Sequence, residues 1–74
     1  MDKDFAYYIR LANTHAGIAR DTTDEGHRDR NYRLALTRLG EAFMLAETLD
    51  QMEQVETAEK YLRALRCRHI VAGL

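Results

Sequence analysis

The sequence predicts a small all-α protein, a three-helix bundle made of a helical hairpin and an N-terminal helix. Apolar residues recur at intervals of three and four, and no stretch alternates with period two for long. Good helix formers such as Ala, Leu, Glu and Arg dominate, and the 74 residues contain no proline. A chain of this length is enough for one domain, so we expect a single helical domain over residues 1–74.

The first helix is expected from about residue 3 to residue 20. On a helical wheel its apolar residues fill an arc of roughly 200°, against about 100° for an ordinary surface helix. The arc is therefore too wide for one neighbouring helix to cover. Its members are Tyr7, Ile18, Leu11, Tyr8, Ala19, Ala12, Phe5, Ala16 and Ile9.

Residues 21–26 (Asp-Thr-Thr-Asp-Glu-Gly) form the clearest break in the pattern. Thr22 and Glu25 have the spacing of a capping box, in which the two side chains satisfy the first backbone N–H groups of a helix. A start after Gly26 fits the sequence as well, so the beginning of the second helix stays open between these positions.

The second helix is expected over about residues 24–49 and carries two adjacent apolar seams, so it should be the central helix. One seam is Tyr32, Leu36, Leu39, Phe43 and Ala46; the other, interrupted by Arg38, is Ala35, Ala42, Leu45, Leu49 and Met52.

The third helix is expected over about residues 52–72, with one seam of Val55, Ala58, Leu62, Leu65, His69 and Ala72. No Gly or Pro separates it from the second helix. One straight helix over about 28–70 would turn its two apolar centres about 110° apart. We therefore favour a tight turn near 49–54, with Asp50 or Gln51 near the new helix start. A continuous helix whose ends pack on different chains is the alternative.

Eleven residues are expected to form the core or an interface between copies. The apolar arcs and the apolar ending 70–74 are too extensive for one small chain to cover, which predicts completion by homodimerisation or a higher homo-oligomer. Phe5, Tyr32 and Phe43 are expected in the core, so Leu39→Asp or Phe43→Asp should unfold the chain and Arg63→Ala should not. The eleven are Phe5, Tyr8, Leu11, Tyr32, Leu36, Leu39, Phe43, Leu45, Leu49, Leu62 and Leu65.

Composition and charge point to a cytoplasmic protein. The apolar runs are far too short for a membrane span, and the residues after Met1 do not have the form of a signal peptide. The single cysteine, Cys67, is typical of a reducing compartment. The formal charge of −1 comes from alternating blocks, and such blocks suit paired helices better than a polyanion partner.

No catalytic, cofactor or metal site is expected. His15, His69 and Cys67 could offer zinc ligands, but Cys67 points about 150° away from His69 on a helix. Both histidines are therefore expected to be boundary residues with hydrogen-bond partners. An acid–base site of paired carboxylates is not expected either, because the glutamates lie largely on solvated faces and Glu56–Lys60 and Glu59–Arg63 have the i,i+4 order that stabilises helices. These carboxylates are Glu41, Glu47, Glu53, Glu56 and Glu59.

Two groups of arginines predict an alternative function, which is DNA or RNA binding in place of protein–protein contact. Arg28, Arg30 and Arg33 form one group, which Asp29 interrupts. The other group is Arg63, Arg66 and Arg68. Either group could contact the phosphates of DNA or RNA, although the segments lack the proportions of a helix-turn-helix.

Length, the absence of cysteine pairs, three amphipathic helices and the dense apolar stretch from Leu39 to Met52 give the chain a resemblance to a phage family. It resembles the small all-helical accessory proteins encoded in the exo–xis region of lambdoid temperate phages. The resemblance implies an early regulator in the host cytoplasm that binds a host protein and alters host growth or the choice between lysis and lysogeny.

Overall fold

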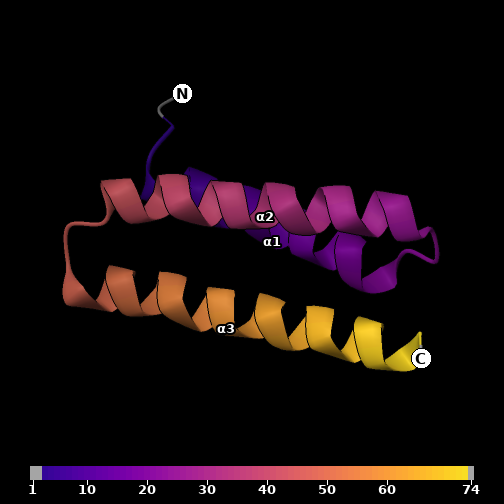
Figure 1. The fold of residues 1–74 in the computed structure, drawn as a ribbon. Helices are drawn as coiled ribbons and strands as arrows, with labels where there is room; N and C mark the ends of the chain where they lie inside the picture. The colour runs from indigo at the N-terminus through magenta and orange to yellow at the C-terminus, as the bar shows by residue number, and fades with distance from the viewer. Residues whose placement is uncertain (1–2, 74) are drawn as a thin grey trace.

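The computed structural model describes residues 3–73 and folds them into three helices (Figure 1). These are α1 (Phe5–Asp21), α2 (Glu25–Leu45) and α3 (Leu49–Ala72). Over this range there is no β-strand, which confirms the all-α prediction. The chain runs up, down and up, so the start of α2 and the end of α3 lie at the same end of an elongated molecule of 41 × 24 × 14 Å.

Each helix begins at a side chain that accepts a hydrogen bond from the first turn. Asp4 Oδ1 accepts from Tyr7 N at 2.9 Å and begins α1. Asp24 Oδ1 accepts from His27 N at 2.8 Å and begins α2, and Thr48 Oγ1 accepts from Gln51 N at 3.1 Å and begins α3. These bonds satisfy backbone donors that have no partner inside the helix.

The start of α2 differs from the expected capping box. Thr22 is not the cap, because its side chain accepts from Asp24 N and stabilises the turn before the helix. Asp24 is the cap and Glu25 is the first helical residue. An aspartate three residues before a free N–H is as good a cap as threonine, so the sequence offered two competing caps and the second one is used.

The break between α2 and α3 is real but lies earlier than expected. The second helix ends at Leu45 instead of about residue 49, and the third begins at Leu49 instead of about residue 52. The Ala46 N–H bonds to the Phe43 carbonyl, which tightens the last turn, and Thr48 then caps α3. The alternative of one continuous helix is therefore wrong, and residues 50 and 51 lie in the first turn of α3.

The core is built on alanines where α1 crosses α2. Ala12 and Ala19 of α1 and Ala35 and Ala42 of α2 are buried. Small side chains let two helix backbones approach closely, so few atoms are needed to fill the space between them. Larger side chains complete the cluster on either side of this seam; they are Ile9, Tyr32, Leu39, Val55 and Leu62.

Helix α2 is the central helix, as its two apolar seams predicted. It packs against both α1 and α3, whereas α1 and α3 touch each other little. Helix α3 contributes Val55, Leu62 and Leu65 to the buried set, and its outer side faces away from the bundle. In Figure 1, α1 and α2 overlap closely while α3 runs beside them as a separate rod.

Phe43 was expected in the core and is exposed, which corrects that prediction; Leu45 and Leu49, expected in the core or an interface, are exposed as well. The buried stripe of α2 does not follow either predicted seam to its end. It runs through Tyr32, Ala35, Leu39 and Ala42 and so takes members from both seams. Because both neighbours pack close to this one stripe, the last members of each seam stay outside.

The remaining expected core residues agree with the structure to different degrees. Tyr32, Leu39, Leu62 and Leu65 are buried. Phe5, Tyr8, Leu11 and Leu36 are half-buried at the edge of the core. Of the apolar ending, Ile70 and Val71 are exposed, and Leu74 lies outside the described residues.

Candidate functional site

Four large apolar side chains are exposed around the point where α2 passes into α3, and we call them the apolar corner. The exposed fractions are 46% for Phe43, 82% for Met44, 43% for Leu45 and 77% for Leu49. The corner is well ordered, because Glu47 N donates to Gln51 Oε1 at 2.7 Å across the turn. Exposed apolar residues that occur in a group, and not singly, are typical of an interaction surface.

The surroundings of the apolar corner are acidic. A shallow depression of about 340 Å³ beside it is lined by Phe5, Leu45 and Glu47 among others. Asp50 and Glu53 follow Leu49 on the exposed first turns of α3. A partner that covers the corner would therefore meet apolar contacts ringed by negative charge, which favours basic groups on that partner.

The opposite end of the molecule is basic. Because α2 is antiparallel to α3, the two arginine groups of the sequence come to the same end of the bundle. Residues 20–33 and 60–73 together hold eight basic and four acidic residues, whereas residues 3–19 and 34–59 hold three basic and seven acidic residues. The molecule thus has a positive half and a negative half, although its net charge is close to zero.

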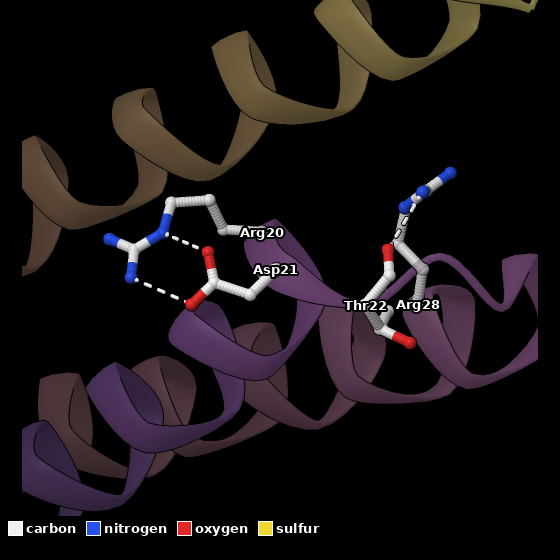
Figure 2. Close-up of polar contacts among 4 residues, drawn as sticks. All are labelled: Arg20, Asp21, Thr22 and Arg28. Atoms are coloured by element: carbon white, nitrogen blue, oxygen red, sulfur yellow. Dashed lines mark hydrogen bonds and ion pairs between the residues drawn. The ribbon is translucent and has the colours of Figure 1, made fainter.

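Two of the arginines at the basic end are held by contacts within the chain (Figure 2). Arg20 Nε donates to Asp21 Oδ1 at 2.8 Å, and its Nη2 donates to Oδ2 at 3.1 Å. Arg28 Nη2 donates to the Thr22 carbonyl at 3.0 Å, across the turn between α1 and α2. The Arg28–Thr22 bond ties the start of α2 to the turn, and the Arg20 guanidinium holds the pKa of the Asp21 carboxyl below its usual value.

Of the other arginines in the predicted phosphate-binding groups, four are exposed without a contact to an aromatic ring: Arg30, Arg33, Arg63 and Arg68. Arg66 lies over the ring of Tyr32, with 5.1 Å between the guanidinium carbon and the ring centroid. That distance is within the range of a cation–π contact between α3 and α2. Within the described residues Arg30, Arg33 and Arg68 are exposed and form no ion pair, so they are the arginines free to contact phosphates.

A small pocket of about 170 Å³ lies between the start of α2 and the end of α3. Arg28, Arg66 and His69 line it, but so do the carboxylates of Glu25 and Asp29. Burial lowers the pKa of His69, and the nearby charges of Arg28 and Arg68 lower it further. The opposite charges in the lining leave the pocket without a clear preference for an anion.

His15 and His69 lie on different helices, α1 and α3, and have different surroundings. His15 Nδ1 lies 2.9 Å from Oδ1 of the buried Asn31, which confirms its expected place as a hydrogen-bonded boundary residue. His69 is half-buried at the other side of the bundle, and Cys67 is exposed. Within residues 3–73, no group of three or more His, Cys, Asp or Glu side chains could hold a metal ion.

The glutamates do not gather into a carboxylate pair. Glu41 forms an ion pair with Arg38, and Glu59 lies 3.7 Å from Arg63 one turn along α3. Glu47, Glu53 and Glu56 are exposed. Burial, together with the neighbouring Glu41 carboxylate, raises the pKa of Tyr8. These contacts are typical of a solvated helix surface.

A groove of about 650 Å³ runs between α1 and α3. Small residues of α1, namely Ala12, Ala16 and Gly17, line it together with Leu39 of α2 and Tyr61 of α3. A Cβ atom added at Gly17 would meet nothing within 4 Å, so the groove is open at this point. The groove exists because α1 and α3 both pack on α2 and hardly touch each other.

The sequence predicted the two arginine groups and more apolar surface than one chain can bury. It did not predict which apolar residues stay exposed. The apolar corner was hidden because Phe43, Leu45 and Leu49 continue helical seams that look like core. Met44 lies off both seams, and a large apolar residue off the seams was the one signal that could have marked the corner as exposed.

No family model, curated protein or solved structure matches this chain. None of the helices within residues 3–73 combines the length and the apolar character that crossing a lipid bilayer requires.

Proposed function

We propose that this protein is a non-catalytic, self-associating interaction module that works as a homodimer. The observation that carries the proposal is the apolar corner, where Phe43, Met44, Leu45 and Leu49 are exposed together. Burying a large apolar side chain is worth roughly 1.5–3 kcal/mol, so a partner surface that covers the corner would gain substantially.

A second copy of the chain is the partner that fits best. A short chain buries a smaller share of its surface than a long one, and small helical proteins commonly complete their core by pairing. Ile70 and Val71, at the far end of α3, form a second exposed apolar pair. The chain therefore offers apolar surface at an acidic end and at a basic end, which two copies could use for each other.

Light scattering of the purified chain at micromolar concentration tests the dimer. We expect a mass of about 17 kDa, twice the 8.6 kDa of one chain. Leu49→Gln should shift the mass toward one chain with helicity unchanged, because Leu49 is exposed and contributes nothing to the core. Leu34→Gln, on an exposed position of α2 away from the corner, is the matched control and should leave the dimer intact.

A compact, fully folded species with the mass of one chain would overturn the homodimer. A Leu49→Gln variant that dimerises as tightly as the native chain, combined with a Leu34→Gln variant that no longer dimerises, would contradict the apolar corner as the interface. The first result removes self-association altogether, and the second moves the interface away from the corner.

The biological role that we propose is that of a small regulatory accessory protein in the cytoplasm of a phage's host, encoded by the phage. The resemblance to the helical proteins of the exo–xis region supports this role, as does the mixed-charge surface that a dimer would present to a larger host protein. A gene position between exo and xis in a temperate phage genome is the expected result. A position among unrelated chromosomal genes would contradict the phage assignment.

Nucleic-acid binding is the second candidate, and one observation favours it. Arg30, Arg33 and Arg63 lie exposed at the same basic end, although they come from two separate sequence groups. Each phosphate contact should make the logarithm of the affinity fall with log salt by a slope of about 0.9. Titration against duplex DNA and single-stranded RNA at two salt concentrations measures that slope.

The double variant Arg30→Ala with Arg33→Ala should flatten the salt dependence if this second function is correct. Arg10→Ala, on the exposed side of α1 and in the acidic half, should not change it. If the chain does not bind nucleic acid, or binds it with an affinity that does not change with salt, nucleic-acid binding is excluded and protein–protein contact stands as the proposed function.

A further inference from the structure

The outer side of α3 carries a stripe of six exposed residues, which we call the outer stripe: Leu49, Glu53, Glu56, Lys60, Arg63 and Cys67. The intervals between them are four, three, four, three and four, so they follow one face of the helix with heptad-like spacing. The intervals are the same when the stripe is read backwards. The charges, however, reverse, because the two acids precede the two bases.

We propose that a second copy of the chain packs antiparallel along this stripe, with the two-fold axis at the level of Ala58. The proposal rests on the self-association proposed above and names its surface and orientation. In this register Glu53 faces Arg63 of the second copy, and Glu56 faces Lys60 of the second copy. Leu49 faces Cys67 of the second copy.

Charge selects the antiparallel orientation over the parallel one. In a parallel pair each residue would face its own equivalent, so Glu53 and Glu56 would meet carboxylates, and Lys60 and Arg63 would meet cations. Like charges placed face to face disfavour an arrangement, whereas opposite charges fix register and orientation. The antiparallel register turns all four charged positions of the stripe into opposite-charge pairs.

The charges of the stripe are little engaged within the chain. Across the described range 3–73, Glu53, Glu56 and Lys60 form no ion pair. Arg63 approaches Glu59 at 3.7 Å, which is beyond hydrogen-bond distance, and its own side chain is 71% exposed. A second copy would therefore not have to break a strong internal contact.

Apolar residues at the two ends of α3 complete the interface. Leu49 begins the helix and Leu45, the last residue of α2, lies just before it, whereas Ile70 and Val71 stand at the end of α3; all four are exposed. Antiparallel packing brings the beginning of one α3 against the end of the other. Each apolar end then covers the opposite apolar end, so burial supplies affinity while the charges between supply the register.

Charge-swap variants test the surface. Glu53→Arg with Glu56→Arg makes the stripe wholly basic, and Lys60→Glu with Arg63→Glu makes it wholly acidic. By sedimentation, each double variant alone should dimerise at least tenfold more weakly than the native chain. An equimolar mixture of the two should recover a species of about 17 kDa, twice the 8.6 kDa of one chain, because every pair is again opposite in charge. Glu25→Arg with Asp29→Arg, at exposed positions of α2, is the control for net charge alone.

Oxidative cross-linking tests the orientation. In the antiparallel register the two Cys67 residues lie 18 helical positions apart, or about 27 Å along the axis, and a disulfide needs Cα atoms within about 7 Å. The native dimer should therefore form no disulfide under mild oxidation. Leu49→Cys should form one with Cys67 of the second copy, and Leu49→Cys with Cys67→Ser should not.

The outcomes separate this proposal from the one on which it rests. A native dimer that both charge-swap variants leave intact, or a Cys67–Cys67 disulfide in the native dimer, overturns the antiparallel stripe and leaves self-association standing. A native chain that is a folded monomer overturns both. If each charge-swap variant dimerises weakly alone and an equimolar mixture of the two dimerises again, the antiparallel stripe is supported.

Discussion

A side-chain hydrogen bond joins His15 of α1 to Asn31 of α2 across the α1–α2 seam, with 2.9 Å between Nδ1 and Oδ1. Asn31 is the buried polar residue of the core, and its Nδ2 donates to the His27 carbonyl at 2.9 Å. Because the amide nitrogen is turned toward that carbonyl, the oxygen faces His15. His15 must then carry its proton on Nδ1 and donate.

Replacing Asn31 by alanine should destabilise the fold. The change leaves the His15 Nδ1–H without its acceptor at a partly buried position, and such losses cost about 1–3 kcal/mol. Urea unfolding followed by circular dichroism measures the loss. Asn13→Ala, at an exposed position on α1, should change the free energy of unfolding by less than about 0.5 kcal/mol. Equal stability of the two variants would mean that the hydrogen bond contributes nothing.

Leu39 and Phe43 lie one turn apart on α2 and should respond differently to the same substitution. Leu39 is fully buried, so Leu39→Asp places an unpaired charge in the core and should unfold the chain. Phe43 is exposed, so the structure reverses the sequence-based expectation, and Phe43→Asp should stay helical and weaken self-association only. Helicity by circular dichroism and mass by light scattering separate the two effects. A Phe43→Asp variant that is unfolded at every protein concentration would show that Phe43 is a core residue after all.

Ala35 is fully buried where α1 and α2 approach most closely, and a larger side chain should not fit there. Ala35→Leu should cost about 1–3 kcal/mol through overpacking. Ala64→Leu, on the exposed side of α3, adds the same atoms in open solvent and should be close to neutral. Thermal unfolding of the two variants provides the comparison, and similar melting temperatures would show that the seam can expand without cost.

Stability should fall with acidification in two separate pH windows. Burial, with Arg28 and Arg68 close by, lowers the folded pKa of His69, so the folded chain favours neutral histidine. The associated stability is complete above the unfolded pKa of about 6.5 and is lost as the pH falls through the lower folded value. The hydrogen bond from His27 N–H lowers the pKa of the Asp24 carboxyl. The contribution of the charged carboxylate to folding stability is therefore lost only below about pH 4.

The measurement that checks these windows is the urea midpoint as a function of pH. The midpoint should be lower at pH 5 than at pH 7.5, and His69→Gln should reduce that difference. Asp24→Asn, which keeps a capping oxygen but cannot be protonated, should reduce the further decrease at lower pH. A midpoint that does not change between pH 7.5 and 5 in the native chain would contradict the stated direction for His69.

The periodicity of apolar residues determined that the chain is helical, because one face of every helix has to leave water whatever the tertiary arrangement. The local chemistry of residues 21–26 likewise marked the first turn, since small and acidic residues favour the ends of helices. The central place of α2 also followed from the sequence, because a helix with two adjacent apolar seams needs two neighbours.

Only the tertiary structure decided which members of those seams are buried. Phe43 and Leu49 have the same local pattern as Leu39, and they differ only in whether a neighbouring helix reaches them. The turn at residues 46–48 was decided by competition between Thr48 and Asp50 for the start of α3, which depends on where α3 can dock on α2. Arg30 and Arg63 come to the same end of the bundle, and the outer stripe of α3 stays exposed, because α2 and α3 pack antiparallel. That packing depends on contacts between residues far apart in the sequence, which the local apolar pattern does not reveal.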